Sequence, residues 1–338
     1  MKMKLLAIAV MATACGSNAL AAEIYNRGNT TLSIGGYVDV GVGEYASSDE
    51  VEVHSVSPRI NVSGTQDLGN GVTVDAKGEW SLNYLDGGEQ SFSTRLGYIG
   101  ATHDQYGRLV VGTQWSPYYD VVGVTDLPIA FANDFIFDDD YYFLGTSRAE
   151  KMVSYRNSLP LGDVGDLHIG LGWQGNHTEE VVDPVATVEY HSRTQAALSF
   201  SIDMVTLGYA YNGGDVTRTE KVDQQSHAVS ISAGEYGSGF YGAAVYAMND
   251  YMNSGIEDTD ALELLLAYGL GYGMNVIGNY EEVVDSDSEN TQYSHAALQL
   301  EYTITPKFMG FAGYQFDAGN DIGEKEEDFW TIGARYFL

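Results

Sequence analysis

The chain has 338 residues, with 47 acidic side chains against 16 basic ones and a formal net charge of −31. This charge argues against nucleic acid as a partner, because phosphate binding needs a basic surface. Cys15 is the only cysteine, so an internal disulfide and a multi-cysteine metal site are both excluded.

The first 21 residues are predicted to be a secretory signal peptide. Lys2 and Lys4 form its basic start, residues 5–12 form a short apolar stretch, and Ala19-Leu20-Ala21 is a small-x-small cleavage site. Cleavage after Ala21 would remove Cys15 and leave 14 basic residues against 47 acidic ones, a net charge of −33. We therefore expect a signal peptide at residues 1–21 and one exported domain at residues 22–338.

The last residues show the pattern on which the fold prediction depends. Apolar residues alternate with small or polar ones from Trp330 to Leu338, so a strand there has one apolar and one polar face. After the signal, the chain has no run of about 18 apolar residues that could form a transmembrane helix. An exported chain that spans a membrane without such helices must form a closed barrel, because every backbone polar group in lipid needs an internal partner.

The connections between the expected strands sort by length. Long, acidic connections are expected at residues 44–53, 85–90, 116–149, 175–193, 212–224, 249–260, 281–292 and 317–328, with brief turns between them. Eight long and seven short connections predict sixteen strands, and an even number is typical of bacterial outer-membrane barrels. Val185 to His191 alternate like a strand but lie within a long connection, so we interpret them as loop structure and not as a seventeenth strand.

The polar faces of the expected strands carry full charges, such as Asp39 in the first strand and Lys77 and Glu79 in a later one. The dry core of a soluble β-sandwich, which is the alternative on composition alone, does not tolerate unpaired charges. A barrel of sixteen strands is wide enough to hold a water-filled lumen. The sequence therefore predicts an all-β fold, a 16-stranded antiparallel transmembrane β-barrel whose interior is a channel.

One long connection, residues 115–149, differs from its acidic neighbours because it contains apolar stretches at 121–124 and 129–131. These stretches indicate packing against protein, which is achieved if the connection folds into the barrel and narrows it. Three segments then resemble the general porin family of Gram-negative outer membranes over the whole mature chain: Ala22-Glu23-Ile24-Tyr25-Asn26, residues 119–128, and Ser154-Tyr155-Arg156-Asn157-Ser158. The resemblance implies a homotrimer of pores, each with an inward-folded constriction loop that faces an arginine cluster.

The resemblance also implies the residues of the constriction. Arg59, Arg95 and Arg148 match the basic wall, and Asp126 matches the first acidic position of the loop. Strand phase places Arg59 and Arg95 on polar faces, whereas Arg148 depends on the match alone.

Two positions depart from the family pattern. The second loop carboxylate falls near Ile129 or Ala130 and is missing, and Tyr37 occupies a wall position that is often basic. Asp134 is a candidate replacement on the loop side. Asp138, Asp139 and Asp140 are further candidates, although such a run is more typical of a solvated face.

The predicted function is passive diffusion of ions and small hydrophilic solutes through a channel with mild cation preference, because an acidic surplus raises the local cation concentration. No nucleophile elbow, phosphate-binding loop or metal-ligand spacing is present, so we expect neither an enzyme nor a cofactor. The expected location is the Gram-negative outer membrane, with membrane lipid and lipopolysaccharide as neighbours. One alternative is a saccharide-selective channel that uses the aromatic residues Trp115, Tyr118, Tyr119, Tyr141, Tyr142 and Phe143. The other is an adhesin or structural barrel whose acidic loops bind a partner.

Overall fold

The computed structural model describes residues 21–45, 50–85, 87, 92–136, 141–182, 185–253, 256–323 and 327–338. The first twenty residues of the predicted signal, and Asp138, Asp139 and Asp140 of the long connection, lie outside these described residues. In the part of the chain that is described, no helix is long and apolar enough to cross a membrane.

The described chain is almost entirely β-strand. The first strands are β1 (Ala22–Arg27), β2 (Thr30–Glu44), β3 (Glu52–His54), β4 (Arg59–Gly69), β5 (Val72–Leu82), β6 (Phe92–His103) and β7 (Gly107–Trp115). Two short helices follow, α2 (Tyr119–Val122) and α3 (Tyr141–Leu144). The middle strands are β8 (Arg148–Pro160), β9 (Asp166–Gln174), β10 (His177–Val182), β11 (Val185–Tyr190), β12 (Arg193–Ile202) and β13 (Val205–Thr217), with a 3-10 turn at Gly162–Val164. The last strands are β14 (Lys221–Glu235), β15 (Ser238–Asp250), β16 (Asp258–Gly271), β17 (Met274–Asp285), β18 (Asn290–Thr305), β19 (Phe308–Asp317) and β20 (Phe329–Phe337).

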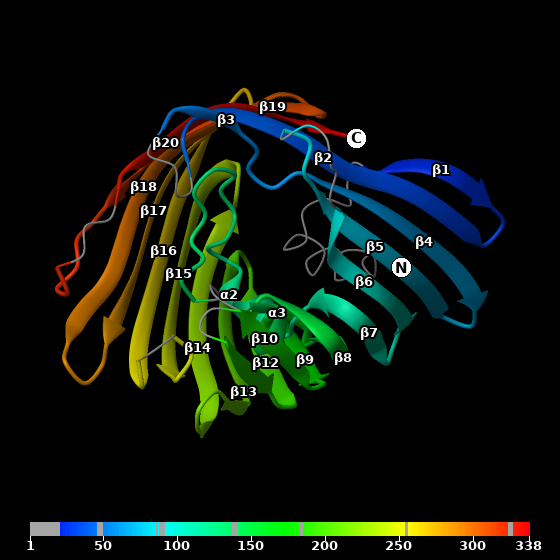
Figure 1. Cartoon of the computed structure of the whole chain (residues 1–338). Coiled ribbons are helices and arrows are strands. Elements are labelled where there is room, and N and C mark those ends of the chain that lie inside the picture. The colour runs from blue at the N-terminus through cyan, green and yellow to red at the C-terminus, as the bar shows by residue number, and fades with distance from the viewer. Residues whose placement is uncertain are drawn as a thin grey trace.

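Sixteen of the twenty described strands form one closed antiparallel ring, β2, β4 to β9 and β12 to β20 (Figure 1). The ring closes where the last strand meets the first, with Tyr37 opposite Phe337 and Glu44 opposite Trp330. Closure leaves the ring without a free edge, so each strand finds its backbone partners inside the wall. The predicted 16-stranded antiparallel barrel is confirmed.

The four remaining strands extend the wall. β1 pairs with β2 at Ala22–Arg27, on the edge that β20 leaves free beyond Tyr37. β3 and β4 lie along the other edge of β2 and are separated by residues 55–58.

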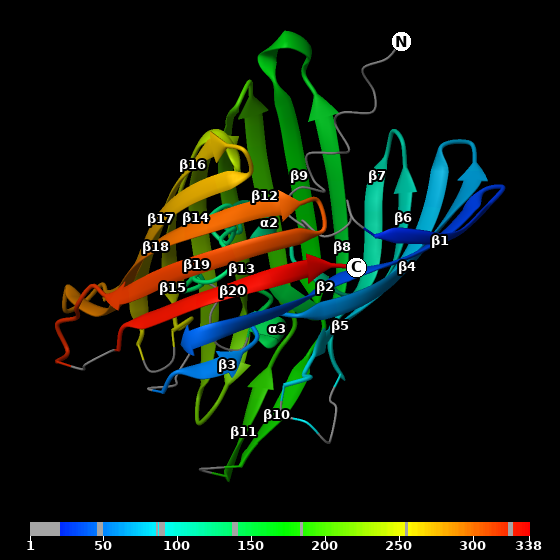
Figure 2. The ribbon, with the colours of Figure 1, turned by 90° about the horizontal axis from the view of Figure 1, so that it is seen from above.

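β10 and β11 form a hairpin that extends beyond the end of the ring where the long connections lie (Figure 2). The interpretation of Val185 to His191 as loop structure was therefore wrong, because Val185–Tyr190 is a strand. β11 pairs with the wall only at Glu189 and Tyr190, which lie opposite the end of β13. It is not a seventeenth wall strand, since β12 takes the place beside β9.

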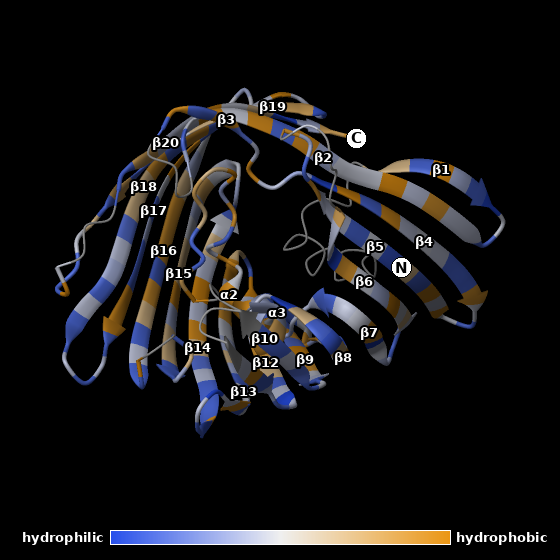
Figure 3. Ribbon diagram, viewed as in Figure 1, coloured by the Kyte–Doolittle hydropathy of each residue, from blue (hydrophilic) through white to orange (hydrophobic). Residues whose placement is uncertain are grey.

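The strands alternate apolar and polar residues along their length (Figure 3). Large apolar side chains stay exposed on the outside of the ring: Ile99 is 68% exposed, Leu298 is 65% exposed and Ile332 is 63% exposed. Water would disfavour so much apolar surface, whereas the hydrocarbon core of a bilayer matches it. The outer face is thus suited to lipid, and the polar residues face inward.

The connection between β7 and β8, residues 116–147, is here named the inner loop. It lies inside the ring of strands beside β14, β15 and β16 (Figure 1). Val121 and Val122 of α2 are fully buried in an apolar cluster with wall residues such as Ala210 and Ala228. Further along the loop, Phe131 packs against Ala297 and Phe311 of the wall, in a second cluster. The apolar stretches that set this connection apart in the sequence are those that it buries.

Candidate channel constriction

Two wall glutamates hold the inner loop by its backbone. Glu301 Oε1 on β18 accepts a 2.8 Å hydrogen bond from the Ile129 N–H. Glu281 Oε2 on β17 accepts hydrogen bonds from the N–H groups of Asp134, at 2.8 Å, and Phe135, at 3.2 Å. These backbone N–H groups would otherwise be buried without a partner, so each glutamate fixes the loop at one level of the wall.

Further attachments lie on either side of these two. Glu263 on β16 accepts hydrogen bonds from the Ile136 N–H at 3.1 Å and from the Thr125 hydroxyl at 2.5 Å. Gln299 on β18 bonds to both the N–H and the carbonyl of Phe131, at 3.0 and 2.6 Å. Between Thr125 and Ile136 the inner loop is therefore attached to β16, β17 and β18.

Asp126 lies on the inner loop, and its Oδ2 accepts a 2.6 Å hydrogen bond from the Tyr119 hydroxyl. Burial raises the pKa of Asp126 to about 6, while the Tyr119 hydroxyl and the positive charges of Arg148, Arg59 and Arg95 act to lower it. The three arginines proposed from the sequence are thus the cations that act on this loop carboxylate.

The basic wall is built around one carboxylate, Glu79 on β5. Its oxygens lie 3.2 Å from Lys77 Nζ, 3.2 Å from Arg95 Nε and 3.9 Å from an Arg59 guanidinium nitrogen. Arg95 reaches Glu79 at an irregularity of the β5–β6 pairing, where Leu96 lies opposite Glu79. Lys77 and Glu79 cancel in charge, so the net positive charge of this cluster is that of Arg59 and Arg95.

Arg148 begins β8 and is enclosed by aromatic rings. Its guanidinium carbon lies 5.2 Å from the ring centre of Trp115, 4.8 Å from that of Tyr141 and 5.1 Å from that of Tyr142. It donates a 2.7 Å hydrogen bond to the Tyr141 hydroxyl, and its buried Nε has no hydrogen-bond partner in the described part of the chain. Rings on several sides hold the cation in place at the root of the inner loop.

The two departures from the family pattern have different outcomes. Tyr37 lies between two guanidiniums, 4.8 Å from that of Arg59 and 3.9 Å from that of Arg335. Asp134 is exposed, and its backbone N–H bonds to Glu281 on the wall that holds the loop. The structure brings together Arg59, Arg95, Arg148, Asp126 and Tyr37, and Asp134 lies further along the inner loop, beside Glu281.

Sequence reasoning missed several charged residues near this region: Asp39, Lys77, Glu79, Glu263, Glu281, Glu301 and Arg335. Strand phase was the available signal, since Asp39, Lys77, Glu79 and Arg335 all fall on the polar faces of their segments. Strand phase predicts whether a side chain faces the lumen or the lipid. It does not predict at which level along the barrel axis that side chain contacts another charged residue.

Most of the aromatic residues around the inner loop contact protein with their rings. Trp115 stacks on Tyr119 at 4.3 Å, and Phe143 stacks on His177 at 3.8 Å. Tyr118 is fully buried and shares a 2.7 Å hydrogen bond with Ser226. These contacts favour the interpretation that the rings anchor the loop. They argue less for the alternative, in which the rings bind sugars.

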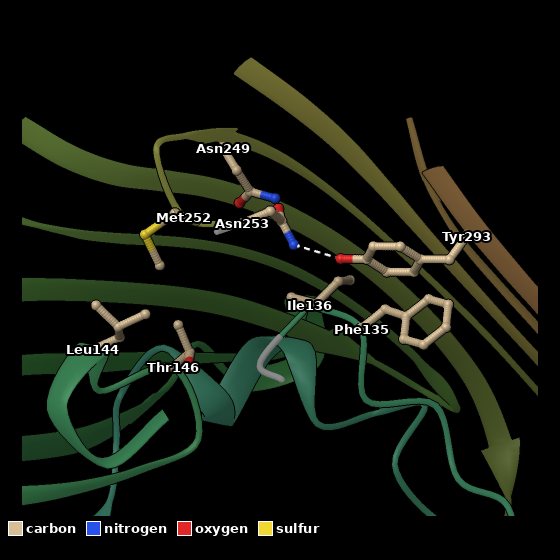
Figure 4. Close-up of a pocket in the computed structure, with 8 residues that line it drawn as sticks. All are labelled: Phe135, Ile136, Leu144, Thr146, Asn249, Met252, Asn253 and Tyr293. Atoms are coloured by element: carbon tan, nitrogen blue, oxygen red, sulfur yellow. Dashed lines mark hydrogen bonds between the residues drawn. The ribbon is translucent and has the colours of Figure 1, made fainter. Parts of the chain in front are cut away.

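A small recess lies beside the inner loop at Phe135 and Ile136 (Figure 4). Phe135 and Ile136 border it from the loop, and Met252 and Asn253 border it from the connection after β15. The Asn253 carboxamide donates a 2.8 Å hydrogen bond to the Tyr293 hydroxyl across it. Elsewhere within the described ranges, no group of three or more His, Cys, Asp or Glu side chains is arranged to hold a metal ion.

The profile of one protein family, described as Gram-negative porin, matches residues 7–338. The chain belongs to the Gram-negative porins. This porin is 25% identical to outer membrane porin C of Serratia marcescens, over 100% of this chain and 89% of the relative. It is 27% identical to outer membrane porin N of Escherichia coli K12, again over 100% of this chain and 89% of the relative.

Solved structures show the same fold. Salmonella typhi OmpF in complex with daunomycin matches with a TM-score of 0.76 and 19% identity, over 94% of this chain and 100% of that one. A trimer form of Vibrio cholerae OmpT matches with a TM-score of 0.67 and 15% identity, over 92% of this chain and 100% of that one. This porin is therefore an outer-membrane channel protein of the general porin kind, located in the Gram-negative outer membrane, and not an enzyme.

Proposed function

We propose that this porin lets ions and small hydrophilic solutes diffuse passively through a constriction between Asp126 on the inner loop and the arginines of the opposite wall. The observation that carries the proposal is the chain of contacts from Asp126 through Tyr119 and Trp115 to Arg148. The charges of Arg148, Arg59 and Arg95 act on the Asp126 carboxylate at this place. Opposed charges across a narrow aqueous passage orient water and polar solutes. Apolar molecules gain nothing from this field, so the passage favours hydrophilic ones.

We further propose a mild preference for cations. The predicted mature chain has a net charge of −33, and within the wall Glu79 offsets part of the charge of Lys77 and the arginines. Reversal potentials of single channels in a potassium chloride gradient test this preference. We expect the sign of cation selectivity, weakening as salt screens the charges, and a reversal potential of anion sign would refute it.

The solute range is tested by liposome swelling with a size series of sugars. A smooth decline of the swelling rate with size supports a general diffusion channel. Saturation by one sugar would instead support the saccharide-selective alternative. The contacts of Tyr118, Tyr119 and Phe143 with protein favour the first outcome.

The proposed assembly is a homotrimer in the outer membrane, in contact with lipid and lipopolysaccharide. Support comes from the match to a solved porin whose structure is a trimer form. Mass determination of the detergent-purified protein tests the trimer, and conductance in a planar bilayer separates a channel from an adhesin or structural barrel. A purified, folded protein that gives no conductance would refute the channel.

A further inference from the structure

A buried ion pair joins the first and last strands of the ring. Asp39 on β2 lies directly opposite Arg335 on β20. Asp39 Oδ2 accepts a 3.0 Å hydrogen bond from Arg335 Nε and lies 2.9 Å from a second guanidinium nitrogen. The side chains are 0% and 10% exposed. A carboxylate and a guanidinium at this distance form a charge-assisted hydrogen bond, which stabilises the charged form of both groups.

The same guanidinium lies over Tyr37, the wall position where the resemblance leads us to expect a basic residue. The distance from the Arg335 guanidinium carbon to the ring centre is 3.9 Å, and Arg59 occupies the region around the same ring at 4.8 Å. Arg59 in turn contacts the Glu79 cluster. Arg335 therefore brings a positive charge to the level of Tyr37 from a different strand.

The other oxygen of Asp39 is fixed by the wall. The segment between β3 and β4, residues 55–58, leaves the ladder, and Asp39 Oδ1 accepts hydrogen bonds from the Val56 N–H at 2.9 Å and the Ser57 N–H at 3.4 Å. Because residues 55–58 do not pair with the backbone of Asp39, the Tyr84 hydroxyl does so instead. It accepts a hydrogen bond from the Asp39 N–H and donates one to the Asp39 carbonyl. The carboxylate cannot follow Arg335 if that side chain moves, because its backbone and Oδ1 are held separately.

We propose that Arg335 and Asp39 are specificity-determining residues of this channel: Arg335 supplies the positive wall charge that Tyr37 lacks, and Asp39 limits how much of that charge a passing ion meets. The inference rests on the proposed channel function. It differs from the eyelet charges Arg59, Arg95 and Arg148, because here the charge and its counter-charge are built into the closing seam of the barrel. Removing either partner should change ion selectivity in opposite directions.

The test is the reversal potential of single channels in a potassium chloride gradient, for the wild type, Asp39→Asn, Arg335→Gln and the double variant. Asp39→Asn leaves Arg335 uncompensated, so the ratio of cation to anion permeability should fall by at least about five-fold, the effect on one ion of a unit charge about 4 Å away in water. Arg335→Gln should raise the ratio by a similar factor for the same reason. The double variant should return close to the wild-type ratio.

A second charge pair on the inside of the wall provides the matched control. Arg108 on β7 and Asp75 on β5 lie 2.6 Å apart, near the short turns and away from Tyr37. Asp75→Asn should change the permeability ratio less than Asp39→Asn does. An equal or larger change would overturn the assignment of specificity to the Tyr37 level.

The outcomes separate this inference from the proposed function. If the wild type does not conduct, the proposed function fails. If the wild type conducts and the folded variants keep its permeability ratio, only the inference on Arg335 and Asp39 fails. A purely structural role for the pair predicts reduced barrel stability in each single variant with no opposite shifts in selectivity. If Asp39→Asn does not fold, the test uses Arg335→Gln and Arg335→Lys. The lysine variant should keep the wild-type ratio of cation to anion permeability, and the glutamine variant should not.

Discussion

Glu281 on β17 accepts a 2.8 Å hydrogen bond from the backbone N–H of Asp134, at the point where the inner loop turns back toward β8. The same carboxylate oxygen accepts the Phe135 N–H. A wall side chain thus satisfies backbone groups that a loop inside a barrel has no strand to pair with. Because a buried N–H without a partner costs free energy, these bonds decide where the loop rests.

Replacing Glu281 with alanine removes the acceptor of two loop N–H groups. We expect the inner loop to loosen, at a cost of about 1–3 kcal/mol in the free energy of unfolding, and the open-channel current to become noisier. Single-channel recording and thermal unfolding in detergent measure the two effects. Glu282→Ala is the matched control, since Glu282 is the next residue of β17 and bonds to Tyr280 instead of the loop. A current as noisy in the control as in Glu281→Ala would contradict the prediction.

The selectivity of the channel should depend on pH through Asp126. Burial raises the pKa of this carboxyl above its ordinary value, to about 6. The group is therefore charged above that pH and neutral below it, so lowering the pH from 7 to 5 removes a negative charge from the loop. We expect the permeability ratio of cations to anions to fall over this range. Reversal potentials measured at both pH values test this.

The control for this pH effect is Asp126→Asn, which has no charge to lose. Its reversal potential should differ from that of the wild type at pH 7 and match it more closely at pH 5. A variant that keeps the full pH-dependent change would show that another group is responsible.

The seam that closes the ring has no room for a side chain at Gly43. A methyl group there would overlap the Trp330 carbonyl oxygen and lie 2.8 Å from Thr331 Cα, and both are backbone atoms of the neighbouring strand. We expect Gly43→Ala to weaken the β2–β20 pairing and lower the thermal midpoint of the barrel, because overpacking against backbone cannot be relieved by a rotamer change.

Gly310→Ala on β19 is the comparison for the seam, since a methyl group there has its nearest neighbour at 3.9 Å. Heating in detergent followed by electrophoresis under mild conditions measures the folded fraction. Equal thermal midpoints for the two variants would count against a crowded seam.

An ion pair holds the root of the inner loop to the wall. Arg156 on β8 contacts Asp120 of α2 with nitrogen-to-oxygen distances of 2.5 and 3.2 Å. The Asp120 side chain is 36% exposed, so solvent screens the pair and Asp120→Asn should lower the free energy of unfolding by at most about 1 kcal/mol. Thermal unfolding compares it with Asp163→Asn in the exposed turn after β8, and a larger loss in the control would contradict the assignment.

Alternation of residues and the sorting of connections by length were enough to predict the strand number. A period of two fixes which side chains face lipid, so the outward Ile99 and Ile332 and the inward Asp39 and Arg335 follow from phase. Alternation also indicated a strand at residues 185–191, and the interpretation of this segment as loop structure was wrong, because a hairpin that extends from the wall alternates as a wall strand does. Alternation gave no warning that residues 55–58 leave the ladder, because that break is compensated by the distant Tyr84 and by the Asp39 carboxylate.

For the candidate constriction, the match of short segments predicted Arg59, Arg95, Arg148 and Asp126, and these are the charges that act on one another. It predicted a loss of charge at Tyr37, and only the folded barrel shows that Arg335 lies against that ring. Asp134, the candidate replacement on the loop side, lies on the inner loop beside Glu281.

The sequence by itself determined the barrel, its strand number and the inward connection, because these depend on periodicity and composition that are local along the chain. Only the closed ring shows which charges meet on its inner face. Ring closure brings residue 39 opposite residue 335, and the attachment of the loop to Glu263, Glu281 and Glu301 sets the position of Asp126. Electrostatic interactions depend on distance in space, and in a closed barrel that distance is fixed by register and loop attachment, neither of which is written in any single segment.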